Sequence, residues 1–297
     1  MLCLTSLTCI VLLGNPSPQA AAAGRFARPP IHWDELNDRA KTQPAWLRLD
    51  WTAKADEPFQ PIHEEVLPFR VFNGFDTKGV WAKKTMAAYN EWIKDPQDPV
   101  KLYRVSAYFG VLNGVDNATP GKTEFTERWS DVQWGWMTLK SGPPSRLFVR
   151  QGYRCSAGNG FRTQYGDLCK KLLASDPLDR SVLLAGIAEL GAERMQWSKA
   201  KNRMYQLPGK GLEFEEFLLK ASDRIRKSSL WRPWDEAHIS DIYAVRAWRT
   251  RKNSDLRKAI DILEKSIKVT PAAHFDVKRM KNHVGFLTRM LQYMQKD

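Results

Sequence analysis

The side chains that could act as acids, bases or metal ligands are scattered along this chain or lie on one helical face. The carboxylates Glu124, Glu127 and Asp131 follow one another at i, i+3 and i+7. Paired carboxylates perform acid–base chemistry in glycosidases, but on an amphipathic helix such a group is usually the solvated face. We expect the solvated face here, because an apolar stripe lies opposite. Its members are Phe125, Trp129, Val132 and Trp136.

The remaining patterns for catalysis are incomplete. No HExxH pair exists that would place two zinc ligands on one helix face. The histidines are instead far apart, at His32, His63, His238, His274 and His283. The Gly-Lys-Gly at 209–211 lacks the spacing of a phosphate-binding loop, and no G-x-S-x-G elbow occurs. The sequence therefore predicts a non-catalytic protein with no cofactor and no metal. The alternative is a secreted carbohydrate-binding protein or glycan-active enzyme that uses the Trp-rich helix 124–136.

The formal charge of +13 is concentrated at the C-terminal end of the chain. Residues 199–297 contain 22 Lys plus Arg and 12 Asp plus Glu, a difference of +10. The segment "RAWRTRKNSDLRK" at 246–258 is the densest part. Such a field attracts acidic partners, and Arg can hold a carboxylate through two hydrogen bonds.

We predict that this basic segment binds a protein or peptide partner that is acidic. Arg246 and Arg249 lie about one helical turn apart, and we expect them to share a solvent-exposed face with Tyr243 and Arg251. An anionic envelope polymer is a second candidate ligand. No nucleic-acid-binding motif is present, so no nucleic acid is expected. The alternative is a solvated basic surface without a specific ligand.

Two tryptophans, Trp231 and Trp234, flank Pro233 immediately before a predicted helix. Tryptophans in a loop could stack on a sugar or on a Pro-rich peptide. They could equally plug the end of a helical stack, and the sequence favours this second interpretation.

The first 24 residues contain no charged side chain, and Leu2 to Leu13 form an apolar run of signal-peptide length. The small residues Ala20 to Gly24 suit a signal peptidase. We therefore predict a cleaved signal peptide over 1–24, a secreted or periplasmic location, and a mature chain without a transmembrane segment.

Removal of the leader leaves two cysteines, Cys155 and Cys169. An even number in an exported chain predicts one disulfide, and two separate buried thiols are the alternative.

Residues 25–75 are rich in proline and carry no sustained period, which predicts an irregular N-terminal arm with one short helix near 33–40. Trp33, Trp46 and Trp51 are expected to hold this arm on the body. A helical-repeat domain is expected over 76–297, because the apolar period becomes helical from residue 78 and Gly or Pro stands at nearly every junction. Residues 145–156 fit a helix or a strand, and their neighbours favour a helix. The sequence thus predicts an all-α fold of stacked helical hairpins. After a first helix from residue 78, the expected helices are 100–112, 125–139, 145–156, 161–175, 178–191, 192–206, 212–228, 235–251, 255–269 and 273–295.

A corner between helices recurs when Pro96, Pro177 and Pro271 are placed in register. Each copy has a turn residue, about four helical turns and then the proline. We expect the proline in the first turn of the following helix, where its missing N–H would have no partner anyway.

Two segments resemble a tetratricopeptide repeat. In "YAVRAWRTRKNSDLRKAIDILEKSIKVTP" (243–271) the matching residues are Tyr243, Ala247, Ala259, Leu263, Ser266 and Pro271. In "RQGYRCSAGNGFRTQYGDLCKKLLASDPLD" (150–179) they are Gly160, Leu172 and Asp176-Pro177, whereas Tyr165 stands where Ala is expected. The resemblance implies a solenoid of helical hairpins that presents a groove to a peptide or protein.

Overall fold

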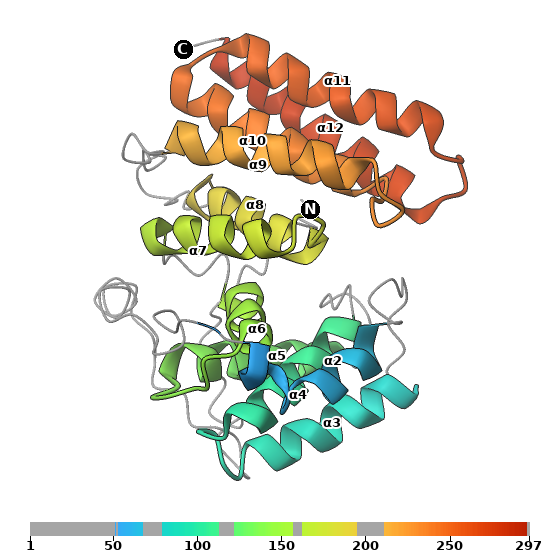
Figure 1. Cartoon of the computed structure of the whole chain (residues 1–297). Coiled ribbons are helices and arrows are strands. Elements are labelled where there is room, and N and C mark those ends of the chain that lie inside the picture. Colours follow the sequence, from blue (N-terminus) through green and yellow to red (C-terminus); the bar gives the residue numbers. More distant parts are fainter. Residues whose placement is uncertain are drawn as a thin grey trace. The chain divides into compact units, whose positions relative to one another are not determined.

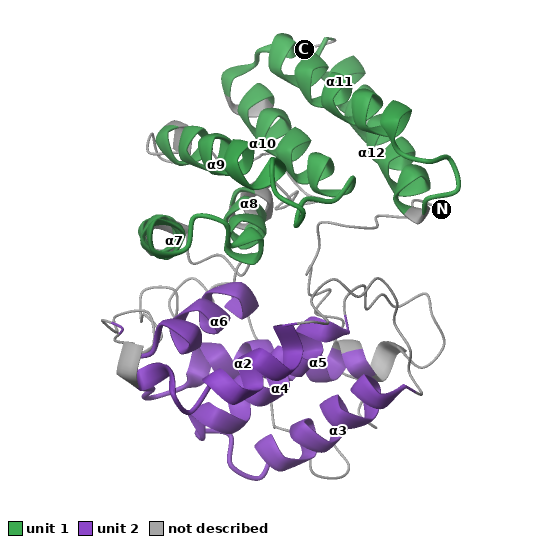
Figure 2. Cartoon of the chain, turned by 45° about the vertical axis from the view of Figure 1, so that its right-hand side comes forward, with its two compact units in different colours: residues 1–10, 157–297 green, residues 11–156 purple. Residues whose placement is uncertain are grey.

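The computed structural model describes residues 51, 53–67, 79–112, 122–156, 162–194 and 211–295. Within these ranges the chain forms eleven α-helices, one 3-10 helix and no strand, which confirms the predicted all-α class (Figure 1). The chain divides after Ser156 into two compact units (Figure 2). The sequence predicted one helical domain over 76–297, whereas this span is shared between the two units. The signal peptide and the short helix near 33–40 lie outside the described residues.

Unit 2 ends at Ser156 and is built around helix α4 (Pro99–Val111). Helices α2, α3, α5 and α6 all pack against α4. Their bounds are α2 Gln60–Val66, α3 Val80–Trp92, α5 Lys122–Thr138 and α6 Arg146–Ser156, and a 3-10 helix, η3, covers Ala53–Asp56. The core is aromatic, and its largest fully buried side chains are Trp92, Trp136, Tyr89, Tyr103, Tyr153, Phe59 and Phe148.

Residues 53–67 of the N-terminal arm belong to this core, where the sequence predicted mostly irregular structure. Phe59 is fully buried, with its ring 4.8 Å from that of Tyr103 and 5.3 Å from that of Phe148. Helix α2 follows directly, with Pro61 in its first turn, where the missing N–H costs no hydrogen bond. The proline content of the arm is therefore compatible with this short helix, because Pro61 occupies its first turn.

Asp56 also attaches the arm, by completing the N-terminus of α6. Its Oδ1 accepts a hydrogen bond from the hydroxyl of Ser145 and one from the backbone N–H of Leu147 at 3.0 Å. The Ser145 hydroxyl in turn accepts from the N–H of Phe148 at 3.1 Å. The first N–H groups of a helix have no partner within the helix, so these contacts satisfy them from a segment 91 residues away in sequence.

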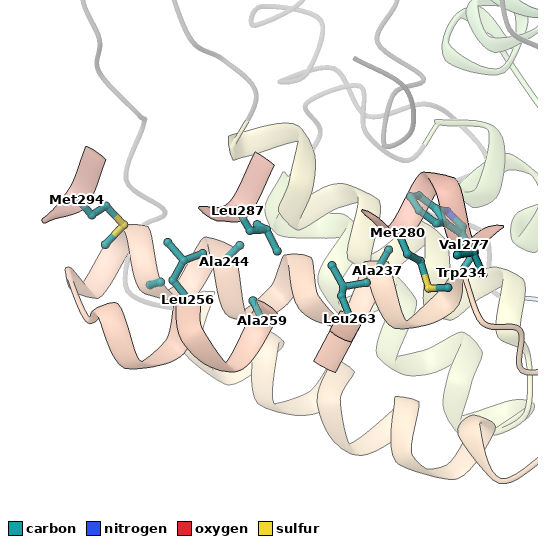
Figure 3. Close-up of a cluster of buried hydrophobic side chains, with 11 residues drawn as sticks. Trp234, Ala237, Ala244, Leu256, Ala259, Leu263, Val277, Met280, Leu287 and Met294 are labelled. Atoms are coloured by element: carbon teal, nitrogen blue, oxygen red, sulfur yellow. The ribbon is translucent and has the colours of Figure 1, made fainter. Parts of the chain in front are cut away.

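Unit 1 comprises six helices in its described part, 162–194 and 211–295. They are α7 Arg162–Ser175, α8 Arg180–Arg194, α9 Gly211–Arg226, α10 Asp235–Thr250, α11 Asn253–Val269 and α12 Phe275–Met294. Helix α10 is the common partner, since α8, α9, α11 and α12 all pack against it. Apolar side chains from the α10, α11 and α12 hairpins meet in one cluster that runs along these helices (Figure 3). Fully buried Ala247 and Ala259 lie in this cluster, and small side chains let α10 and α11 approach closely.

The corner between α3 and α4 (residues 95–98) and the corner between α7 and α8 (residues 176–179) are built alike. In each, the N–H of the second aspartate donates to the carbonyl of the first at 3.1 Å. The carboxylate of that second aspartate, Asp98 or Asp179, then caps the next helix. It accepts the N–H groups two and three residues further on, at 2.8 and 3.1 Å for Asp98 and at 3.1 Å twice for Asp179.

The prolines of these corners lie between helices, not in the first turn of the next helix as predicted. Helix α4 begins at Pro99, three residues after Pro96, and α8 begins at Arg180, three residues after Pro177. The first helical position follows the capping aspartate, so the earlier proline serves to end the previous helix. Pro271 lies in the same way between α11 and α12, where the ring nitrogen Nδ1 of His274 takes the capping role at 3.2 Å from the N–H of Asp276.

Only one of the two segments that resemble a tetratricopeptide repeat forms a hairpin within a unit. Residues 243–271 span α10 and α11, which pack closely on each other. Residues 150–179 instead contain α6 of unit 2 and α7 of unit 1, and α7 packs on α8. The side chain of Tyr165 lies outside the described residues.

Candidate functional site

In the part of the chain that the structure describes, a group of exposed cations lies at and just after the corner between α10 and α11. We call Arg251, Lys252, Arg257 and Lys258 the basic corner, and all four side chains are exposed. Only residues 251 and 252 connect the two helices, so Arg251 and Lys252 form the connection and Arg257 and Lys258 lie in the second turn of α11. Asp255, which is half-buried, is the one acidic residue in the first turn of α11.

Arg251 has a left-handed backbone, with φ 56° and ψ 27°. It is the only residue other than glycine with positive φ among those the structure describes. The N–H groups of Arg251 and Lys252 both donate to the carbonyl of Ala247, which closes α10. Glycine is the usual residue at this position, because a β-carbon in this conformation costs about 1 to 2 kcal/mol. A cation near the last carbonyls of a helix stabilises the helix by about 0.3 to 1 kcal/mol, which offsets part of this cost.

Tyr243 of α10 contacts one lysine of the basic corner, Lys258. The Nζ of Lys258 is 4.5 Å from the centre of the Tyr243 ring, and the guanidinium carbon of Arg246 is 5.8 Å from it. Cations are attracted to the negative face of an aromatic ring. The half-buried tyrosine therefore limits the freedom of Lys258 while leaving its ammonium group exposed.

Arg246 is an internal residue, which corrects its predicted place on a solvent-exposed face. Its Nε lies 3.3 Å from Oε2 of Glu215, a fully buried residue of α9, and the Arg246 side chain itself is only 20% exposed. A buried carboxylate needs a paired charge, so Arg246 is used to join α10 to α9. The side chain of Arg249, the fourth predicted binding residue, lies outside the described residues. Among the predicted binding residues, Arg251 is exposed and Tyr243 contacts Lys258, and the sequence prediction did not include the exposed residues Lys252, Arg257 and Lys258.

Both loop tryptophans contact protein groups. Trp234 is 9% exposed and belongs to the α10–α12 cluster (Figure 3), with the Arg279 guanidinium 4.2 Å from its ring centre. Trp231 is half-buried, and its Nε1 donates to Oε1 of Glu236 at 2.9 Å. The Arg226 guanidinium, which also pairs with Glu236, lies 5.7 Å from the Trp231 ring. These contacts support the interpretation that the tryptophans close the end of the helical stack.

A buried polar network around the start of α10 was missed by the sequence reasoning. Arg180 of α8 donates to both carboxylate oxygens of Asp235, which is fully buried. One turn and a half further along α10, Asp241 lies 3.1 Å from Nε2 of His283 on α12. The sequence feature that could have revealed this network was the spacing of Asp235, His238 and Asp241 along one side of a predicted helix. This network joins α8, α10 and α12.

Burial shifts several pKa values in the same network. Burial lowers the pKa of His238, against the opposing effect of the nearby carboxylates Asp235 and Asp241. It also lowers the pKa of Arg232, with the charge of Arg180 as the second cause, and it raises the pKa of Asp276. Each carboxylate of the network is close to an Arg or His side chain, as in a structural ion-pair network. Within the described ranges no group of His, Cys, Asp and Glu side chains could hold a metal ion.

The Trp-rich helix α5 is largely buried in its second half. Trp134 is 5% exposed, Trp136 is fully buried, and neither ring is accessible for stacking on a sugar. Asp131 was expected on the solvated face, but it is 3% exposed and accepts a hydrogen bond from the Tyr89 hydroxyl at 2.7 Å. Glu127 is exposed as expected, and the side chain of Glu124 lies outside the described residues. The expected carboxylate face is therefore not solvated throughout.

The predicted disulfide is not formed in this structure. Cys155 and Cys169 are both buried thiols, and they belong to different units. Cys155 Sγ lies 3.5 Å from Nε2 of Gln151, and Cys169 Sγ lies 4.0 Å from the carbonyl oxygen of Val182. Each sulfur thus contacts a group of its own unit.

Comparisons with known proteins identify no relative. No protein-family model, no curated protein and no solved structure matches the chain. In the described part of the chain, no helix is both long and apolar enough to cross a bilayer.

Proposed function

We propose that this protein is an exported, non-catalytic helical-hairpin protein that binds an acidic protein or peptide partner at the basic corner. The observation that carries the proposal is the exposure of Arg251 and Lys252 in the connection between α10 and α11 and of Arg257 and Lys258 in the second turn of α11. A positive field of this kind attracts carboxylate-rich segments and raises their rate of encounter.

The arrangement of helices supports a surface of this type. The hairpin of α10 and α11 is closely packed through fully buried alanines, and this packing supports the corner that connects the two helices. We propose that the hairpins of unit 1 form a solenoid similar to tetratricopeptide repeats. In such stacks a hairpin buries only part of its apolar surface, and the side chains left on one face bind partners.

The export part of the proposal rests on the uncharged, apolar leader and the alanine run that follows it. Its test is N-terminal sequencing of the protein recovered from the cells that make it. We expect the mature chain to begin near residues 23 to 25. Recovery of protein that still starts at Met1 would contradict export.

The binding test uses charge reversal at the basic corner. The probe is a fluorescein-labelled polyglutamate peptide, titrated with the full chain at low and at physiological ionic strength. We expect the double variant Arg257→Glu/Lys258→Glu to weaken binding about tenfold or more. We also expect binding by the original protein to weaken with salt, because exposed charges are screened beyond about 8 Å at physiological ionic strength.

A matched control separates the corner from the overall charge. Lys83 of α3 and Lys171 of α7 are exposed and lie outside the corner, so Lys83→Glu/Lys171→Glu changes the net charge by the same four units. This control should bind the peptide almost as the original protein does. Equal loss in both double variants, or no binding by the original protein, would reject the corner as a specific site.

Parallel titrations address the other anionic ligands. Vesicles of anionic phospholipid, an anionic wall polymer and a short oligonucleotide should each bind more weakly than the polyglutamate peptide. Stronger corner-dependent binding of any of these would replace the acidic protein as the partner. No observation favours the carbohydrate alternative, since Trp134 and Trp136 are buried.

A further inference from the structure

The most unusual backbone in the basic corner belongs to Arg251. A left-handed residue at the end of a helix is normally Gly or Asn, and an arginine β-carbon makes this conformation less favourable. The end of α10 would therefore be more stable with Gly at this position. The strain coincides with an exposed side chain in the basic corner, the surface proposed to bind the partner.

The properties of arginine suggest what the strained residue provides. A glycine would close the helix through the same backbone N–H groups, because both bonds to the Ala247 carbonyl come from the main chain. The side chain adds a planar fork of N–H donors that matches the two oxygens of a carboxylate. Lys252 follows Arg251 in the sequence, and Arg257 and Lys258 are exposed in the second turn of α11, so a partner whose carboxylate is held at Arg251 could place further acidic groups near these cations.

We propose that Arg251 is the anchoring residue of the basic corner and holds one carboxylate of an aspartate or glutamate side chain of the partner in a bidentate pair. This inference rests on the proposed function and deepens it. On this inference, the left-handed conformation of Arg251 lowers the stability of the protein but is kept because the side chain serves binding, as at other strained functional residues.

The test measures stability and binding on the same variants. Arg251→Gly should raise the unfolding midpoint temperature, because strain is relieved, and should weaken binding of the labelled polyglutamate peptide about fivefold or more. Arg251→Lys keeps the charge and the interaction with the helix dipole but loses the fork. We expect Arg251→Lys to leave the midpoint nearly unchanged and to weaken binding about threefold.

The outcomes separate this inference from the proposed function. If Arg251→Gly binds the peptide as well as the original protein does, while Arg257→Glu/Lys258→Glu loses it, the anchoring role is wrong and the acidic partner stands. If Arg251→Lys binds as well as the original protein, the bidentate pair is wrong. If the original protein does not bind the peptide at low salt, both the anchor and the proposed function are rejected.

Discussion

The guanidinium group of Arg180 spans both carboxylate oxygens of Asp235, with Nε 2.6 Å from Oδ2 and Nη2 against Oδ1. The two residues are 55 positions apart and join α8 to α10. Asp235 is fully buried, and the Arg180 side chain is 20% exposed. The pair therefore replaces most of the water that a carboxylate would otherwise retain.

Loss of the arginine should destabilise unit 1 strongly. Arg180→Ala leaves the Asp235 carboxylate buried without its paired charge, so we expect the free energy of unfolding to fall by about 3 kcal/mol. Urea denaturation measures this change. The control is Lys265→Ala, which removes an exposed pair with Asp261 and should cost about 0.5 kcal/mol or less. Similar losses in the two variants would contradict the structural role of the Arg180–Asp235 pair.

The attachment of the arm to unit 2 can be tested at Phe59. Phe59→Ala removes a fully buried ring and should lower the free energy of unfolding by about 3 to 4 kcal/mol. Leu67→Ala is the matched control from the same segment, because Leu67 is 50% exposed and should cost about 0.5 kcal/mol or less. Urea denaturation followed by tryptophan fluorescence distinguishes them. A Phe59 variant as stable as the control would show that the arm is dispensable.

The alkaline stability of unit 2 should depend on Tyr108. Burial raises its pKa to about 12, and the hydrogen bond that its hydroxyl donates to Glu65 acts in the same direction. An unfolded tyrosine has a pKa of about 10. Between these values the folded state binds more protons, so the free energy of unfolding falls as pH rises through this window. Tyr108→Phe removes this contribution, and its unfolding free energy should decline less steeply from about pH 10 to 12. An unchanged slope would show that Tyr108 does not titrate this way.

The cysteines offer a direct chemical test. Because Cys155 and Cys169 are buried thiols in different units, an alkylating reagent should modify neither quickly in the folded protein. After unfolding without a reductant, both should be alkylated, as read by peptide mass spectrometry. A peptide pair joined through these two sulfurs would instead support the disulfide that the sequence predicted.

Most helices of the body could be located from the sequence because their signals are local. The prediction of 161–175, 235–251 and 255–269 agrees with α7, α10 and α11 within two residues at each end. Apolar periodicity sets the length of each helix, and a proline or a capping residue sets its end. Helix α2 in the arm was not predicted, because it has only seven residues and is stabilised by packing on α4 rather than by a local sequence signal.

The candidate site was predicted less well, because residues far away in sequence determine which of its charged side chains are buried in pairs and which stay exposed. Arg246 looked like its neighbours in sequence, yet it pairs with Glu215, 31 residues away. Asp131 likewise matched a solvated helix face, yet its partner Tyr89 lies 42 residues away. A pattern of charges along one helix does not reveal which of them another helix will cover. Only the tertiary packing separates the structural cations from the exposed ones.

The two aspartate-capped corners bear on how the chain acquires its fold during synthesis. The hydrogen bonds that close the turn and cap the next helix at residues 95–98 and 176–179 come from within a few positions of the same stretch. Each corner can therefore form as soon as its own residues have left the ribosome, before later helices exist. Local contacts of this kind form fast, whereas closing long loops is slow. The chain would thus emerge as preformed helical pairs, α3 with α4 and later α7 with α8, and its slow steps would be the joining of distant segments such as Asp56 to the start of α6.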